Sequence, residues 1–472
     1  MRLLPVKYMA ASHIKEAEMN IEEIVRNQRN YFMTGATRPL AFRLAALRKL
    51  QQAVRDHENE ICEALREDLN KQPFESYMAE IGMVLDEVRF HIRHLPRWMK
   101  EKQVPTPLAQ FHAVSFISPE PYGVALIMSP WNYPILLCLD PLIGAIAAGN
   151  CAVVKPSAYT PASSRVIASI VESIYPPEYI AVVQGGRQEN TALLAQEFDY
   201  IFFTGSVTVG KAVMEAAARN LTPMTLELGG KSPTIVDASA DLKLAAKRIA
   251  FGKLLNSGQT CVAPDYVLVE ESVRDALIQN LSSVLEEQFP DGDYSGFVRI
   301  VNERHYREKK ELLEGQTAAF GGECDDAAWR IKPTVLIDVN PDSPVMQQEI
   351  FGPILPVLTW AKLDDAISFV RSRPKPLALY LFTSQRDVEK RVLEGCSFGG
   401  GCINDTVIHL ATPHMGFGGV GQSGMGSYHG KRSFDTFTHY RSIVRKSTWL
   451  DLPFRYFPSS EKKLKLIRRI LK

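Results

Sequence analysis

The sequence carries almost no net charge, no paired-cysteine motif and no long hydrophobic run. A formal charge of +1 over 472 residues provides no field that would gather nucleic-acid phosphates, so nucleic acid is not expected as a partner. The cysteines are odd in number and widely spaced, without a CxxC pair or a His-rich spacing, which predicts reduced thiols and no metal site. The seven cysteines are Cys62, Cys138, Cys151, Cys261, Cys324, Cys396 and Cys402.

Signals for export and for membrane spanning are also missing. The apolar stretch 135–148 is interrupted by Asp140, Pro141 and Gly144. No window reaches the roughly 18 to 20 apolar residues that cross a bilayer. Only a few apolar residues lie between Arg2 and Lys7, too few for the central region of a secretory signal. We therefore expect a cytoplasmic protein.

The composition is that of a folded globular protein. Apolar residues make up 46% of the chain and charged residues 23%, which leaves no sign of an extended disordered region. At 472 residues the chain is longer than a single core usually supports, so two or three packed domains are expected.

Short β-rich runs alternate with helical stretches along most of the chain. A helical lead-in covers 21–97, and crossover helices are predicted from residues 135, 161 and 207. A second alternation follows TLELGG and continues to about Pro413. We predict an α/β fold, with a doubly wound parallel-sheet domain followed by a second α/β domain. The predicted strands include 124–128, 152–154, 180–183, 201–203 and 266–270, and further helices cover 242–255 and begin at 274.

Cys261 is the candidate nucleophile. A lone cysteine is commonly a small core hydrophobe. Cys261, however, closes the run NSGQTC in a predicted polar loop between a helix and a strand, where polar neighbours suit a positioned thiol. A thiol is the side chain best able to add covalently to a carbonyl near neutral pH.

Two further side chains could assist such a thiol. Glu227 lies between Leu226 and Leu228 at a predicted strand end, where a carboxylate is either solvated or faces a cleft as a general base. Asn132, in PWNYP, follows a buried strand. It is either a turn former or a neutral donor that stabilises a developing oxyanion.

Three segments are candidates for cofactor binding. Lys155 ends a predicted strand, where it either faces water or reaches the hydroxyls or phosphates of a dinucleotide. The run FTGSVTVGK places Gly205, Ser206 and Gly210 at a strand-to-helix turn whose amides can face a pyrophosphate, although it is not the GxGxxG fingerprint. A third turn, QEIFGP, is uninformative by itself.

Seven motifs in one order over residues 130–426 resemble the aldehyde dehydrogenase superfamily: PWNYP, VVKPS, FTGS, LELGGKSP, NSGQTC, EIFGP and SGMG. The run INDT at 403–406 and the segment 416–439 resemble its class 3 branch. That resemblance implies oxidation of medium-chain, long-chain or aromatic aldehydes to carboxylic acids with NAD or NADP.

The resemblance also implies roles for individual residues. Cys261 would form a thiohemiacetal and then a thioester, Asn132 would hold the oxyanion with the Cys261 amide, and Glu227 would activate the hydrolytic water. Lys155 would bind the adenosine ribose, with Glu349 at the nicotinamide ribose and Phe351 at its ring. The implied cofactor-binding residues are Lys155, Ser157, Gly205, Ser206, Gly210, Glu349 and Phe351.

By the same resemblance, 1–102 and 122–229 form the NAD(P)-binding domain and 230–415 the catalytic domain. Segments 103–121 and 430–447 form an oligomerisation arm that implies a homodimer, and 448–472 form a basic tail. Members of this branch tend to start near Asn20, so residues 1–19 are expected to be an extension or to follow a misplaced start codon.

Two features qualify the cofactor and the location. Ala158 stands where many relatives carry an acid against the adenosine 2′-hydroxyl, so use of both NAD and NADP is predicted. The tail EKKLKLIRRILK places Leu464, Ile467, Ile470 and Leu471 on one helical face. It is predicted to be a solvated or subunit-contacting terminus, or to lie weakly on the inner membrane surface.

Two alternative functions stay open at this point. One is a CoA-acylating aldehyde dehydrogenase, in which the thioester passes to CoA rather than water, although Glu227 argues against it. The other is a catalytically silent structural protein of the same fold, which would make the competent residues at every expected position a coincidence.

Overall fold

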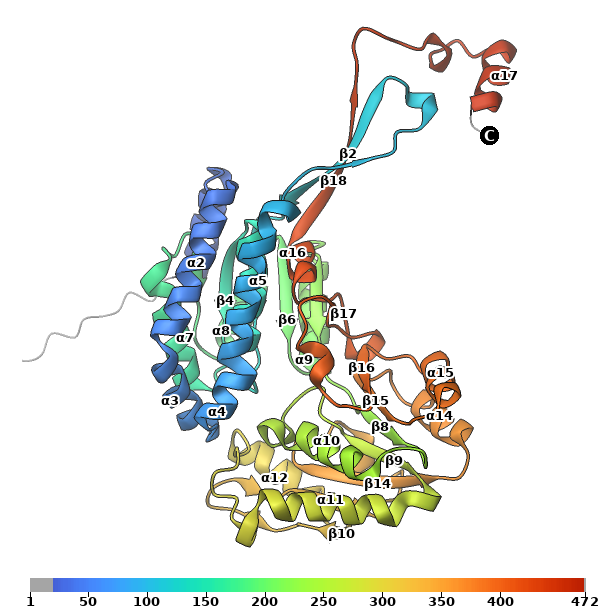
Figure 1. The fold of residues 1–472 in the computed structure, drawn as a ribbon. Helices are drawn as coiled ribbons and strands as arrows, with labels where there is room; N and C mark the ends of the chain where they lie inside the picture. Colours follow the sequence, from blue (N-terminus) through green and yellow to red (C-terminus); the bar gives the residue numbers. More distant parts are fainter. Residues whose placement is uncertain (1–19, 471–472) are drawn as a thin grey trace, which may run out of the picture.

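The computed structural model describes residues 20–470, which form two sheet domains and a projecting arm (Figure 1). The first sheet has six strands in the order β17-β7-β6-β3-β4-β5, and the second has seven in the order β10-β13-β14-β9-β8-β15-β16. Strands are parallel in both sheets except for β17 and β10 at the edges. The predicted α/β fold with two sheet domains is confirmed.

The chain begins with the predicted helical lead-in. Asn20 caps the first helix by accepting a hydrogen bond from the Glu22 amide. Leu47, Leu50 and Val54 are fully buried, as their helical spacing predicts. The elements are α1 (Ile21–Met33), α2 (Leu40–Asp56), α3 (Glu58–Leu69), α4 (Pro73–Ser76), a π-helical turn η1 (Tyr77–Ile81) and α5 (Gly82–Trp98).

The first sheet is covered by helices on both faces. Every residue of its central strands β3 and β4 is buried, which explains their unbroken apolar sequences. All thirteen residues of α6 (Leu136–Ala148) are buried beside them. The strands are β3 (Val124–Met128), β4 (Cys151–Lys155), β5 (Ile180–Val182), β6 (Tyr200–Thr204) and β7 (Met224–Glu227), and the other helices are α7 (Pro161–Ile174), α8 (Arg187–Leu194) and α9 (Val207–Ala218).

A late segment of the chain returns to this first domain. Strand β17 (Gly424–Met425) pairs with β7. Helix α16 (Lys431–Thr436) packs on α6, where Ser433 lies so close to Gly144 that a Cβ there would be 2.9 Å from it. Within the predicted arm segment 430–447, therefore, the first residues are a helix of the domain body rather than part of the arm.

The second sheet forms the other domain. Helix α10 ends at Leu254, one residue earlier than predicted, because the chain turns at Leu255 toward the nucleophile loop. The strands are β8 (Pro233–Val236), β9 (Tyr266–Glu270), β10 (Thr317–Phe320), β13 (Thr334–Ile337), β14 (Ile354–Trp360), β15 (Ala378–Phe382) and β16 (Gly400–Ile403), with a hairpin β11 (Cys324–Asp325) and β12 (Arg330–Ile331). The helices are α10 (Leu242–Leu254), α11 (Arg274–Gln288), α12 (Glu303–Glu311), α13 (Pro344–Gln347), α14 (Leu363–Arg371) and α15 (Arg386–Gly395).

The arm is a separate antiparallel sheet that projects from the body (Figure 1). It is built from β1 (Lys102–Val104), β2 (Ala113–Pro121) and β18 (Thr438–Lys446), and the chain beyond it ends in α17 (Glu461–Ile470). Across residues 20–470, none of the helices combines the length and apolar character that crossing a membrane requires.

Candidate active site

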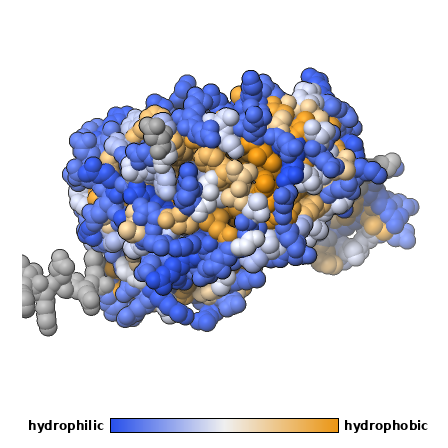
Figure 2. Space-filling view, turned by 90° about the horizontal axis from the view of Figure 1, so that it is seen from below, coloured by the Kyte–Doolittle hydropathy of each residue, from blue (hydrophilic) through white to orange (hydrophobic). Residues whose placement is uncertain are grey.

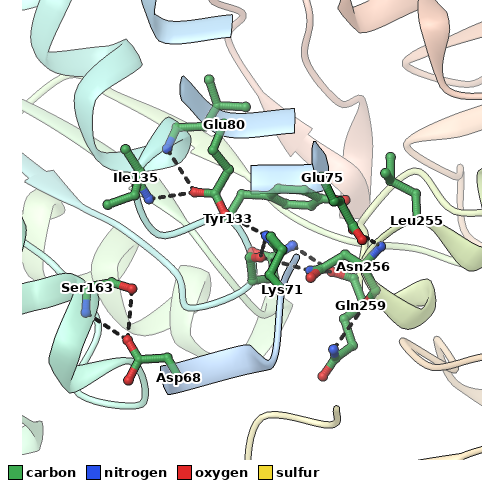
Figure 3. Close-up of polar contacts among 12 residues, drawn as sticks. Asp68, Lys71, Glu75, Glu80, Tyr133, Ile135, Ser163, Leu255, Asn256 and Gln259 are labelled. Atoms are coloured by element: carbon green, nitrogen blue, oxygen red, sulfur yellow. Dashed lines mark hydrogen bonds and ion pairs between the residues drawn. The ribbon is translucent and has the colours of Figure 1, made fainter. Parts of the chain in front are cut away.

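The loop that carries Cys261 is held in a strained turn. Asn256, Ser257 and Gly258 have φ angles of 53°, 56° and 70°, three successive residues in the left-handed region. The Asn256 amide N–H donates to Glu75 Oε1 at 2.6 Å, and its side-chain amide donates to the Asn132 carbonyl at 2.8 Å (Figure 3). These bonds offset the strain of the turn and hold the residues that follow it, up to Cys261, in place.

Cys261 lies where two cavities meet. One cavity of about 240 Å³ and another of about 260 Å³ are both lined by Cys261 and Glu227, together with Leu137, Thr204 and Leu228. Burial raises the pKa of the thiol, and the carboxylates of Glu349 and Glu227 raise it further, while backbone amides at Cys261 and Val262 act in the opposite direction. The thiol is therefore protonated until a group at the site accepts its proton.

Glu227 ends β7 and points into this junction rather than into water. Its side chain is 3% exposed, and neither carboxylate oxygen has a hydrogen-bond partner among the described residues. Burial raises the pKa of the carboxyl well above its ordinary value. A buried carboxyl with unused oxygens beside a thiol can exchange a proton with a water molecule.

Asn132 occupies the turn between β3 and α6. Its amide nitrogen Nδ2 donates to the Gln259 carbonyl at 3.0 Å, two residues before Cys261. One N–H of the amide is thereby oriented by the nucleophile loop, and Asn132 also lines the second cavity. The other N–H remains to act as a neutral donor near the thiol.

The 240 Å³ cavity has an almost entirely apolar wall. Met78 and Ala79 come from η1, Phe251 from α10, and Ile408 from the segment after β16. Met78, Phe251 and Ile408 are partly exposed. Figure 2 shows hydrophobic residues gathered across the middle of one face between hydrophilic borders. The remaining wall residues include Met83, Tyr133, Leu255, Val262, Leu377, Val407, Leu410, Ala411, Phe417 and Tyr428.

The 260 Å³ cavity is more polar and contains four of the seven predicted cofactor residues: Gly205, Ser206, Glu349 and Phe351. Trp131, His305 and Lys309 also line it, and sequence reasoning did not select them. Trp131 stands beside Asn132 in PWNYP, so the motif could have suggested it. His305 and Lys309 lie on α12 in a segment without a motif and are brought to the cavity only by folding.

The three other predicted cofactor residues do not line this cavity. Lys155 ends β4 and its ammonium donates to the Pro156 and Gly185 carbonyls, each at 2.7 Å. The Ser157 hydroxyl accepts from the Tyr159 amide at 3.2 Å. Gly210 differs from the expectation more clearly, because its amide donates to the Ser206 carbonyl at 2.9 Å and a Cβ there would lie 2.7 Å from Leu228. Gly210 therefore permits close packing and has no free N–H for a pyrophosphate.

The cavity suits a dinucleotide. Ser206 caps the N-terminus of α9, where helix amides and the helix dipole favour a phosphate. Glu349 is half-buried, and burial and Asp265 raise the pKa of its carboxyl to about 8. One Glu349 oxygen has no partner within residues 20–470, which fits a ribose hydroxyl as donor. Phe351 and Trp131 place their rings 5.4 Å apart at 80° on the wall.

A dinucleotide-type sheet with a thiol between a polar and an apolar cavity is the arrangement expected of an oxidoreductase that uses NAD or NADP. The model of the aldehyde dehydrogenase family matches residues 5–443, and the chain belongs to that family. It is an NAD(P)-dependent enzyme that oxidises aldehydes to carboxylic acids, as the motifs predicted.

Individual relatives place the chain near the class 3 branch. It is 49% identical over 461 residues to 4,4'-diaponeurosporen-aldehyde dehydrogenase of Staphylococcus aureus, covering 96% of this chain and 99% of that protein. It is 44% identical to aldehyde dehydrogenase family 3 member A2 of Pongo abelii, covering 93% and 92%. The structure of Staphylococcus aureus AldH in a substrate-bound state superimposes with a TM-score of 0.93 at 48% identity, covering 96% and 99%.

Proposed function

We propose that the chain oxidises apolar aldehydes through a thioester on Cys261 that is hydrolysed by water activated by Glu227. The observation that carries this proposal is that Cys261 and Glu227 line both the apolar and the polar cavity. An aldehyde in the apolar cavity and a dinucleotide in the polar one would meet at the sulfur, where positioning and oxyanion stabilisation lower the barrier.

The Cys261 thiol first gives up its proton to water in the cavity; the thiolate then adds to the aldehyde carbon, and the carbonyl oxygen becomes an oxyanion that accepts from Asn132 Nδ2 and the Cys261 amide. When bound, NAD or NADP supplies the hydride acceptor. Loss of the hydride converts the thiohemiacetal into a thioester. Glu227 then takes a proton from a water molecule, the water oxygen bonds to the thioester carbon, and the Cys261 thiolate leaves.

Four residues would hold the dinucleotide in the polar cavity. Gly205 and Ser206 would face the pyrophosphate at the start of α9, while Glu349 would accept from the nicotinamide ribose and Phe351 would bound the ring. Lys155, at the end of β4, would contact the adenosine ribose through the third N–H of its ammonium, since the other two donate to carbonyls.

The wall of the other cavity selects the aldehyde. Its methionine, leucine and aromatic side chains bury hydrocarbon and offer few polar partners, which favours medium-chain, long-chain or aromatic aldehydes.

The test is reduced-cofactor absorbance with hexanal, dodecanal and benzaldehyde for the parent and for Cys261→Ser. Turnover by the parent alone supports the thioester mechanism, and equal turnover by Cys261→Ser overturns it. Acyl-CoA formation on adding CoA would favour the CoA-acylating alternative. A parent without activity toward any of the three aldehydes would favour the silent structural protein.

We also propose that both NAD and NADP are accepted. Ala158 is exposed just beyond Lys155 and carries no carboxylate that would repel a 2′-phosphate. Steady-state kinetics with each cofactor check this, and a hundredfold preference for NAD would defeat it.

We propose a homodimer joined through the arm. β18 pairs with β2 along nine residues on one side, and within the described chain its other edge has no strand beside it. An unpaired strand edge with exposed apolar side chains such as Val444 is a surface that a second copy can cover. Sedimentation equilibrium of the parent and of a Val444→Asp variant checks this, and two monomeric proteins would refute it.

We propose a weak membrane contact for α17. Leu464 and Ile467 are three residues apart on this basic helix, so they share a face, whereas Leu471 and the Ile470 side chain lie outside the described part of the chain. Liposome co-sedimentation lost on deleting 461–472 supports the contact at the inner membrane surface. Unchanged sedimentation ends it.

A further inference from the structure

A lysine and a glutamate form an ion pair that is completely buried beside the active site. Lys71 Nζ lies 2.5 Å from Glu80 Oε1, and both side chains are 0% exposed. Taking two charges out of water is costly unless further hydrogen bonds satisfy them. The remaining bonds of the two groups therefore indicate what the pair does.

Lys71 directs its ammonium at the turn that contains the oxyanion donor. Lys71 Nζ donates to the Asn132 carbonyl at 3.3 Å, the same oxygen that accepts from Asn256 Nδ2 at 2.8 Å (Figure 3). The ammonium also lies 4.4 Å from the centre of the Tyr133 ring. The Tyr133 hydroxyl is bonded to Thr260 Oγ1 at 2.6 Å, directly before Cys261.

Glu80 holds the other end of the same turn. Its second oxygen, Oε2, accepts from the Ile135 amide at 2.8 Å and from the Leu136 amide at 3.3 Å, where α6 begins. A carboxylate at a helix N-terminus satisfies orphan amides and is favoured by the helix dipole. The two charges thus hold the backbone of residues 132–136 from both sides, and this backbone carries the Asn132 side chain.

The ion pair also belongs to the segment that forms the aldehyde cavity. Lys71 precedes α4 and Glu80 lies within η1, whose Met78 and Ala79 line the apolar cavity. Glu75, in between, accepts the Asn256 amide in the nucleophile loop. One short segment therefore contacts the aldehyde cavity on one side, and the oxyanion turn and nucleophile loop on the other.

We propose that Lys71 and Glu80 are positioning residues that set the side-chain amide of Asn132 for the oxyanion. This inference rests on the proposed role of Asn132. Neither residue lines the cavities, so neither touches the aldehyde or the dinucleotide. They act through the Asn132 backbone and the first turn of α6, and a displacement of about 1 Å at such a donor costs roughly a hundredfold in rate.

The test is a double-mutant cycle with Lys71→Met and Asn132→Ala. We expect Lys71→Met to lower kcat roughly 10- to 100-fold with little change in the KM for NAD, since the cofactor cavity is untouched. In the Asn132→Ala background, Lys71→Met should cause no further loss, because the donor it positions is gone. A merely structural role would lower kcat equally in both backgrounds and would overturn the proposal.

Two further variants serve as controls, one for loss of folding and one for the general effect of removing a buried cation. Lys71→Met leaves Glu80 unpaired, so Lys71→Met/Glu80→Gln, which removes both charges, carries the test if the single variant does not fold. Arg43→Met is the matched control because Arg43 is another buried cation, bonded to the Ala147 carbonyl at 3.1 Å at the far end of α6. It should lower thermal stability and leave kcat within about twofold.

Failure of the inference can be told apart from failure of the proposed function. If Asn132→Ala alone leaves kcat unchanged, the oxyanion role of Asn132 is wrong. If Asn132→Ala lowers kcat while Lys71→Met is without effect or adds fully to it, the proposed mechanism stands and the positioning role of Lys71 and Glu80 is wrong.

Discussion

At the scale of single residues, burial changes what the side chains at the site can do. Glu227 would be an ordinary strand carboxylate if it faced water. Enclosed between the two cavities, its carboxyl has a pKa well above the usual range because burial disfavours the charged form. A raised pKa makes the ionised carboxylate a stronger base, but it is populated only as the pH rises.

A pH dependence of turnover follows from this environment. The kcat of the parent should increase as pH rises, because the ionised, basic form of Glu227 accumulates. In Glu227→Gln the rate of thioester hydrolysis should fall roughly a hundredfold, and kcat should no longer increase with pH. Steady-state profiles over about pH 6 to 9 measure both effects. Glu349→Gln is the control because the Glu349 carboxyl, with a pKa of about 8, titrates in the same range. If kcat of Glu227→Gln depends on pH in the same way as kcat of the parent, the prediction is contradicted.

Gly258 shows how one residue sustains the strained nucleophile loop. A Cβ at Gly258 would lie 2.3 Å from the Gly352 carbonyl, at a φ of 70°. Gly258→Ala should therefore lower both the thermal unfolding midpoint and kcat. Gly315→Ala is the matched control, because Gly315 has the same φ of 70° but an added Cβ there would have nothing within 4 Å. It should therefore show only the backbone cost of about 1 to 2 kcal/mol for a side chain in the left-handed region. Equal effects of the two substitutions would show that the contact with Gly352 is unimportant.

At the scale of elements, the π-helical turn η1 is the most consequential local feature. Helix π-turns often occur at functional sites because the extra residue redirects side chains. Here η1 places Met78 and Ala79 on the wall of the apolar cavity while it buries Glu80 against the start of α6. A change in this turn should alter which aldehydes fit before it alters the chemistry.

Ala79→Leu tests the part of η1 that bounds the cavity. The larger side chain should fill part of the 240 Å³ space and reduce kcat/KM for dodecanal by about tenfold or more, because overpacking an apolar pocket excludes long chains. Acetaldehyde is the control substrate, as it fills little of the cavity. Parallel losses for both aldehydes would mean that Ala79 affects the reaction centre rather than chain length.

At the scale of the whole molecule, buried ionisable groups join elements that are far apart in the sequence. Glu87 of α5, Asp140 of α6 and His429 place potential ligand atoms within 4.8 Å of one another. His91 also faces Glu87, and burial lowers the pKa of its ring to about 4. Burial, followed by the nearby Asp140, raises the pKa of the Glu87 carboxyl to about 9. Burial therefore favours the protonated form of the Glu87 carboxyl in the folded protein.

The stability of the fold should depend on this proton. The pKa of Glu87 is higher in the folded protein than the value of about 4.3 expected for the unfolded chain, so its contribution to stability is fully present below about pH 4.3. That contribution is lost as the pH rises toward 9, by no more than about 1.4 kcal/mol per pH unit. Glu87→Gln mimics the protonated carboxyl and should flatten the fall of the unfolding midpoint over about pH 6 to 9. Glu60→Gln, the same substitution at an exposed position of α3, is the control. An unchanged slope in Glu87→Gln would contradict the assignment.

Much of the site could be predicted because its residues sit in local motifs at the ends of elements. Strand periodicity places Glu227 and Lys155 at strand ends, and proline and glycine mark the turns of Asn132 and Cys261. Four of the seven predicted cofactor residues line the polar cavity for the same reason. Local sequence is sufficient there, because an element's end depends mainly on its own residues.

The sequence by itself determined the alternation of strands and helices, the turns at their ends and the chemical types of the side chains in those turns. Only the tertiary structure decided that Cys261 and Glu227 share two cavities, that Met78 and Ile408 face one of them, and that Lys71 reaches the Asn132 turn. Those contacts join residues tens to hundreds of positions apart. Burial, which raises the pKa values of Glu227 and Cys261, depends on every element packed around them, and no local pattern encodes it.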